Sequence, residues 1–164
     1  MNKKIDPQST KSLSEVYGEG PLARFVREHR TGGSLPVRMI RVRQPALTQV
    51  DPPVREVSLQ IALKADMPFR WNLGDGWSKA RARDGSSILV PARTEIAYEC
   101  GGEADVLMVA IPERELGGVL EENEGLALSA LDAATHQGCM VDARLITSAR
   151  SLWQEALRND PTSD

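Results

Sequence analysis

The feature that most constrains this chain is a period of two in the apolar residues between Pro36 and Pro112. The clearest case is the segment 57–64, VSLQIALK, in which Val, Leu, Ile and Leu alternate with Ser, Gln, Ala and Lys. Successive side chains of a strand point to opposite faces. The segment is therefore predicted to be a half-buried strand with one apolar face and one wet face.

Further strand-like segments follow at intervals of about ten residues, separated by turn chemistry. Gly74-Asp75-Gly76 and Asp84-Gly85 are hairpin signals, because Asp-Gly suits tight turns between alternating segments. The remaining predicted strands cover 36–43, 69–73, 77–83, 87–91, 94–100 and 105–111. Many short strands at even spacing predict a mainly β chain that forms a small barrel or sandwich.

The two ends of the chain have other patterns. Residues 1–20 are expected to be a loose arm, and Leu22, Phe25, Val26 and His29 have the spacing of a short helix. Residues 112–121 are expected to form a turn of helix, and residues 126–128 an edge strand.

The clearest helix follows a plausible N-cap at Asp142 and stops before Pro161. One apolar stripe runs along it, as expected of a helix that buries one face. The stripe consists of Leu145, Ala149, Leu152, Trp153, Ala156 and Leu157.

The chain has 164 residues, which suits one folded domain. We divide it into an arm (1–20), a barrel (21–135) and a helical tail (136–164). Cys100 and Cys139 form no CxxC pair, and no apolar stretch follows the two lysines near the start. A reducing, cytoplasmic location is therefore expected, without a membrane span.

The net charge of −3 is unevenly distributed, since residues 1–50 hold nine Lys or Arg against four Asp or Glu. The basic first third either contacts phosphate or an acidic partner, or consists of solvated strand edges. The second reading is preferred, because arginines such as Arg38 and Arg41 alternate with apolar residues.

Few residues have the pattern of catalytic chemistry. His29 and His136 are far apart, and neither has a neighbour at metal-ligand spacing, so no metal is expected. Phosphate-binding glycine motifs and a nucleophile elbow are absent from the sequence. Glu95 and Glu99 are either a carboxylate pair or part of a wet strand face, and we prefer the wet face.

The aromatic residues indicate a pocket instead. Trp71 and Trp77 flank one hairpin and Tyr98 lies on a later strand, so a closed barrel would point some of these rings inward. Alternatively, the tryptophans only fill the core. Arg81 could also supply a polar group to such a pocket. The predicted effector-binding residues are Trp71, Trp77, Arg83, Arg93, Glu95 and Tyr98.

The stretch from Gly76 to Pro112 resembles the sensor domain of AraC-type transcription regulators. The likeness consists of a Trp beside a hairpin, then Asp84-Gly85 followed by Pro91, then the segment 103–107 and Pro112 at the end of its strand. It extends upstream to VSLQIALK and downstream to the helix from Asp142 to Arg158.

The resemblance implies a cupin-like barrel, of the double-stranded β-helix or jelly-roll type, followed by one or two helices. It implies a small effector in the barrel, no cofactor, and a homodimer formed through Leu145, Ala149, Leu152, Trp153 and Leu157. DNA would be bound by a helix-turn-helix half that is not part of this sequence. Where metal-dependent cupins place a Gly and a further His, this chain has Arg93 and Ile96.

Two alternatives to a non-enzymatic regulator remain. One is a small cupin enzyme, an isomerase or lyase without metal, using Glu95 or Tyr98. The other is a standalone cupin module that binds or scaffolds a partner without catalysis.

Overall fold

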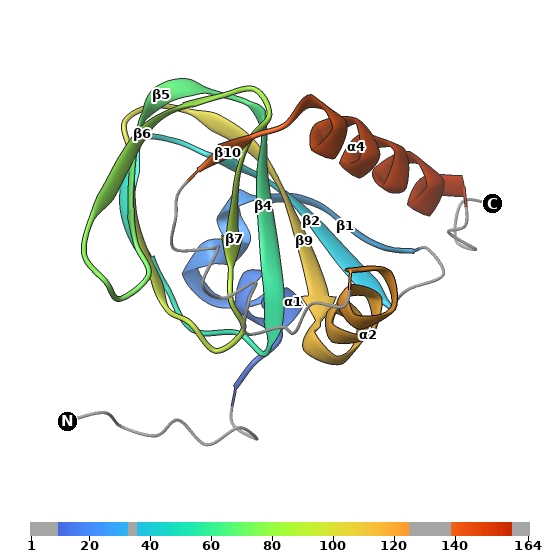
Figure 1. Ribbon diagram of the computed structural model, residues 1–164. Helices are drawn as coiled ribbons and strands as arrows, with labels where there is room; N and C mark the ends of the chain where they lie inside the picture. The colour runs from blue at the N-terminus through green and yellow to red at the C-terminus, as the bar shows by residue number, and fades with distance from the viewer. Residues whose placement is uncertain (1–9, 33–35, 125–138, 159–164) are drawn as a thin grey trace.

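The computed structural model describes residues 10–32, 36–124 and 139–158, and its strands form two antiparallel sheets (Figure 1). The six-stranded sheet has the order β1 (Val26–Gly32), β2 (Val37–Gln44), β9 (Ala104–Pro112), β4 (Glu56–Lys64), β7 (Ser86–Val90) and β10 (Met140–Val141). The four-stranded sheet has the order β3 (Leu47–Asp51), β8 (Ile96–Cys100), β5 (Asp66–Asn72) and β6 (Ser78–Arg83).

The strand order is that of a jelly roll. Strands β2 to β9 pair as β2-β9-β4-β7 in one sheet and β3-β8-β5-β6 in the other, so the chain crosses repeatedly between the sheets. Eight strands in two facing sheets with Greek-key connections define the jelly roll, which is the architecture of cupins. The domain is therefore mainly β and cupin-like, with a helix after the barrel, as the sequence predicted.

Turn chemistry fixes two of the connections as expected. Gly85 has a φ of 83° between β6 and β7, and Gly74 and Gly76 have φ values of 111° and 106° between β5 and β6. The Asn72 side-chain oxygen accepts hydrogen bonds from the backbone N–H groups of both Gly74 and Gly76. Residues without a Cβ are needed at such positive φ angles.

Helix α4 (Ala143–Arg158) covers the outer face of the six-stranded sheet (Figure 1). As predicted, Asp142 caps it by accepting a hydrogen bond of 2.8 Å from the backbone N–H of Arg144. The guanidinium of Arg30 lies 3.9 Å from the ring centroid of Trp153 and donates to the Trp153 carbonyl at 3.1 Å. The apolar stripe of α4 thus packs on the chain's own β-sheet.

The beginning of the described chain differs from the prediction. Residues 10–20 are not a loose arm, because helix α1 (Leu13–Gly18) is fixed by a capping box between Ser12 and Glu15 and Tyr17 is fully buried. The helix expected at residues 22–29 is a short 3-10 helix, η1 (Gly20–Phe25), followed directly by β1. Leu22 and Phe25 are both buried in η1. Two residues three positions apart lie on one side of a 3-10 helix as well as of an α-helix, so their spacing does not distinguish the two.

Other differences concern short strands. Sequence patterning missed β1, β3 and β10, and β10 pairs with β7, so the tail expected at 136–164 contributes a strand to the barrel. The turn of helix expected at 112–121 is α2 (Glu113–Glu124). The edge strand expected at 126–128 lies outside the described residues. None of the helices described is long and apolar enough to cross a membrane.

Candidate ligand-binding site

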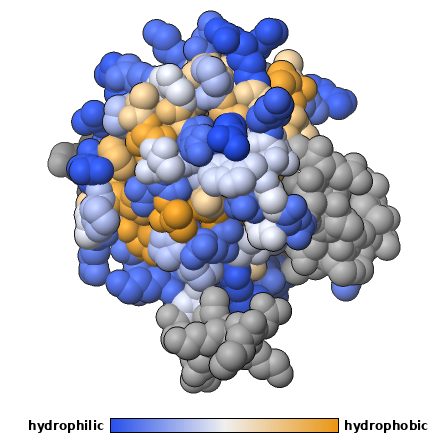
Figure 2. Space-filling view, turned by 90° about the vertical axis from the view of Figure 1, so that its left-hand side faces the viewer, coloured by the Kyte–Doolittle hydropathy of each residue, from blue (hydrophilic) through white to orange (hydrophobic). Residues whose placement is uncertain are grey.

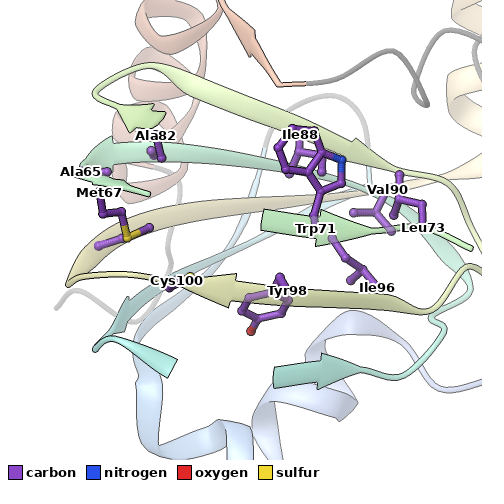
Figure 3. Packing of buried hydrophobic residues seen from close by; sticks show 12 residues of the cluster. Ala65, Met67, Trp71, Leu73, Ala82, Ile88, Val90, Ile96, Tyr98 and Cys100 are labelled. Carbon is purple, nitrogen blue, oxygen red and sulfur yellow. The ribbon is translucent and has the colours of Figure 1, made fainter. Parts of the chain in front are cut away.

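A small cavity of about 50 Å³ lies between the two sheets. Apolar side chains such as Phe69 and Ile88 line part of it, and the polar side chains that line it include Gln44, Gln60 and Tyr98. Figure 3 shows the surrounding cluster, in which Met67 and Cys100 lie near one end of the barrel and Trp71 near the other. The cavity therefore combines apolar walls with a few polar groups, which is the usual composition of a small-molecule site.

The polar wall arises from the inner face of β4. Leu59, Ile61 and Leu63 point outward beneath α4, so Gln60 and Ala62 point inward to the cavity. The face that the sequence analysis took as wet is thus the barrel interior.

A buried hydrogen-bond network joins this cavity to α1. Tyr17 of α1 donates to one carboxylate oxygen of Asp51 at 2.6 Å, and Tyr98 donates to the other at 3.3 Å. The side-chain amide of Gln44 donates to the Tyr98 hydroxyl at 3.0 Å. Tyr98 and Gln44 both line the cavity, so a ligand that hydrogen-bonds to either one would perturb the contact between β3 and α1.

Burial controls the ionisation of this network. Desolvation raises the pKa of Asp51 to about 6, although the two tyrosine hydroxyls act in the opposite direction. Desolvation and, to a smaller extent, the nearby charge of Asp51 also raise the pKa of the Cys100 thiol, to about 11. The Cys139 thiol, which lines the same cavity, also has its pKa raised by burial. Both cysteines are therefore thiols near neutral pH and are not activated nucleophiles.

A larger cleft of about 880 Å³ lies at one end of the barrel. Buried Ala65 and Ala104 are its apolar members, and Ala104 also lines the interior cavity. The charged residues around it come from the ends of β2, β4, β5, β6 and β9. They are Arg43, Lys64, Asp66, Arg81, Arg83, Asp84, Glu103 and Asp105. Ala104 thus lines both the cleft and the cavity.

The six predicted effector-binding residues do not converge. Trp71 and Tyr98 are register partners on β5 and β8 and are buried in one cluster. Arg83 lies in the cleft at the barrel end. Trp77 is 45% exposed, and the Arg70 guanidinium lies 5.0 Å from its ring centroid.

The other two predicted residues lie elsewhere. Arg93 pairs with Glu113 at 2.6 Å and has a φ of 59°, a backbone conformation that favours glycine. Glu95 is exposed just before β8, and Glu99 on β8 is partly exposed and pairs with Arg70. Ligand binding by all six residues stays a prediction.

Sequence reasoning missed Gln44, Gln60 and Lys64 as site candidates. Gln60 stands on the polar side of the alternating segment 57–64, and that polarity was the available signal. The polar side faces the barrel interior because α4 covers the apolar side, and the alternation within 57–64 does not reveal that helix.

The predicted dimerisation residues lie against the six-stranded sheet. Ala149 is buried, and Leu145, Leu152 and Trp153 are partly buried in the cluster with Ile61 and Val109. The Leu157 side chain lies outside what the structure describes. A role for this stripe in dimerisation stays a prediction.

Metal-ligating side chains do not cluster among residues 10–32, 36–124 and 139–158, where no group of three His, Cys, Asp or Glu is placed to hold an ion. His29 is exposed on β1, and His136 lies outside these ranges.

The side of the molecule formed by the four-stranded sheet is shown in Figure 2. Apolar and charged side chains are interspersed on it. Charged pairs on this side include Arg70–Glu99 and Arg81–Asp66, at 2.9 and 2.7 Å.

No protein-family model and no curated protein matches this chain. Solved structures that it resembles include hydroxypropylphosphonic acid epoxidase from S. wedmorenis, at 15% identity over 46% of this chain and 44% of that chain, with a TM-score of 0.38. Another is the ethanolamine utilization protein EutQ from Salmonella typhimurium LT2, at 13% identity over 46% and 58%, with a TM-score of 0.38. The aligned part spans less than two thirds of either protein. These similarities are weak, and the assignment as a cupin-like domain rests on the strand order.

Proposed function

We propose that this chain is the ligand-sensing and dimerisation domain of an AraC-type transcription regulator, and that a small effector enters the barrel from the cleft. The observation that carries the proposal is the polar inner wall of Gln44, Gln60 and Tyr98 around a cavity that shares Ala104 with the charged cleft. A barrel that serves only as a scaffold has no need of buried polar groups, since each requires a compensating hydrogen bond.

The size of the cavity indicates how sensing would work. At about 50 Å³ it has room for only one or two waters, since a water occupies about 30 Å³. An effector larger than this must shift interior side chains or remain largely in the cleft. Its binding would favour one interior packing over another, which a sensor requires. The Tyr98–Asp51–Tyr17 hydrogen bonds offer a route from the cavity to α1.

The regulatory part of the proposal is supported by the order of motifs from Gly76 to Pro112 and by the jelly-roll topology. A thermal-melt screen of a metabolite library against the purified domain tests effector binding. A ligand at a hundred times its dissociation constant should stabilise the native state by about 2.7 kcal/mol. Failure of every compound in a broad library to raise the melting temperature would favour the scaffold alternative.

Dimerisation through α4 is tested by sedimentation. Leu145, Leu152 and Trp153 keep part of their surface accessible, and Ser148 and Ser151 are exposed on the same helix. We expect a dimer for the wild-type chain and monomers for the variant Ser148→Arg/Ser151→Arg, whose changes do not touch the packed face. A wild-type monomer, or an unchanged dimer in the variant, would refute this role for α4.

A metal-free enzyme is favoured by one observation, the Tyr98 hydroxyl that lines the cavity while hydrogen-bonded to Asp51. Such a hydroxyl can donate or accept a proton at a bound substrate. Compounds found in the screen should be incubated with wild-type protein and with Tyr98→Phe. Turnover that Tyr98→Phe abolishes would support the enzyme, and stable binding without turnover would support the sensor.

A further inference from the structure

The charged cleft at the barrel end suggests which class of ligand it accepts. We propose that it binds a small molecule through an oxyanion, a carboxylate or a phosphate, held by Lys64 and Arg83. This inference rests on the proposed function, because it names the chemical class of the effector.

All four carboxylates of the cleft already accept a hydrogen bond from the protein. Glu103 pairs with Arg43 at 2.7 Å and Asp66 pairs with Arg81 at 2.7 Å. Asp105 accepts from Arg41, which lies outside the cleft, at 2.9 Å, and Asp84 accepts from the backbone N–H of Ala65 at 2.9 Å. Arg43 and Arg81 thus hold Glu103 and Asp66 as anions, and the pKa of both carboxyls is lowered.

Two cations of the cleft remain. Among the described residues, neither Lys64 nor Arg83 forms a side-chain ion pair or hydrogen bond, although Lys64 lies near enough to Glu103, and Arg83 to Asp66, to lower their pKa values. The four cations and four carboxylates of the lining cancel in number. Because Arg41, from outside the cleft, also pairs with Asp105, the cleft has an excess of one positive charge. The free hydrogen-bond donors are those of Lys64 and Arg83.

The backbone fixes where these two cations stand. Lys64 ends β4 opposite Asp105, and Arg83 ends β6 opposite Asp66. The backbone N–H of Arg83 donates to the Ser86 hydroxyl at 2.8 Å, which secures the start of the turn to β7. Arginine and lysine are the side chains that bind carboxylate and phosphate groups most strongly. An anionic head group held here would leave the rest of the ligand over Ala65 and Ala104.

The test is an NMR titration of the isotope-labelled full chain with inorganic phosphate, with succinate and with uncharged succinamide, at constant ionic strength. We expect saturable shifts at residues 64–66, 81–84 and 103–105 with phosphate or succinate, and none with succinamide. The anion that binds more tightly identifies the head group. The double variant Lys64→Gln/Arg83→Gln should weaken binding about tenfold or more, as expected for loss of charge-assisted hydrogen bonds.

The control double variant Lys79→Gln/Arg38→Gln removes the same charge from exposed strand positions outside the cleft and should bind like wild type. Equal weakening in both variants would show a general surface-charge effect and overturn the inference, as would binding of succinamide or absence of saturable shifts. A neutral compound that stabilises the domain, with an affinity unaffected by Lys64→Gln/Arg83→Gln, would also overturn it. That last result would leave the sensor proposal intact.

Discussion

The two faces of the six-stranded sheet differ although they belong to the same strands. On the outer face, Leu59, Ile61 and Leu63 of β4 pack with Leu107 and Val109 of β9 under α4. On the inner face, Ser58, Gln60 and Ala62 of β4 point into the barrel, and Gln60 and Ala62 line its cavity.

The difference teaches that polarity on a strand does not always mark the solvent side. Here the helix covers the apolar face, and the polar face encloses a space where a ligand can make hydrogen bonds. Stability should therefore depend mainly on the outer face, and binding on the inner face. The following predictions test that division, beginning with the largest effect.

Ile61→Ala should strongly destabilise the domain. Ile61 is fully buried under α4, and Ile→Ala changes at such sites cost about 2–5 kcal/mol, because transfer energy is lost and a cavity remains. Denaturant unfolding followed by circular dichroism measures this cost. A loss below about 0.5 kcal/mol, the range typical of surface substitutions, would contradict the assignment of stability to the outer face.

Asp51 should give the inner side a pH-dependent stability. Its native pKa of about 6 exceeds the ordinary 3.8, so the native state holds the proton more tightly than the unfolded state does. The unfolding free energy should consequently fall as pH rises from about 4 to 6, by about 3 kcal/mol at 1.36 kcal/mol per pKa unit, and the penalty persists above that range.

In Asp51→Asn this contribution should disappear, so the variant should lack this fall and the wild-type minus variant difference should itself fall by about 3 kcal/mol across the same range. Urea unfolding at several pH values measures both proteins. A difference that stays flat in this window, because both proteins show the same slope, would show that another group titrates.

Ser58→Ala should have the smallest effect. Ser58 is adjacent to the outer-face residues of β4 but points inward, and its buried hydroxyl has no hydrogen-bond partner among the described residues. Removing an unsatisfied polar atom is near neutral or stabilises by about 1 kcal/mol. A loss approaching that of Ile61→Ala would remove the contrast between the two faces.

Local patterning predicted most of the barrel. Alternation and Asp-Gly turns located β2 and β4–β9, and the stripe after Asp142 located α4 and its cap. It missed β1 and the shorter strands β3 and β10, and it misread α1, whose stability depends on the burial of Tyr17 against Asp51, 34 positions away. Long-range contacts of this kind leave no trace in local periodicity.

The candidate site was less predictable than the fold. Some of the rings of Trp71, Trp77 and Tyr98 were expected to point inward; Trp71 and Tyr98 are buried and Trp77 is exposed, which the alternation alone did not distinguish. The cleft residues Lys64 and Glu103 are far apart in sequence, and the pairing of β4 with β9 in the six-stranded sheet brings them together.

The central claim is that the inner face binds a ligand while the outer face stabilises the domain. The direct measurement is the rise in melting temperature produced by each screened compound on wild type, on Ala104→Leu and on Ile61→Val. Ala104→Leu adds bulk at the residue that lines both cavity and cleft, and Ile61→Val supplies a comparable modest destabilisation on the outer face. We predict that the rise is lost in Ala104→Leu and retained in Ile61→Val. A rise retained in both would place the ligand outside the barrel and contradict the account.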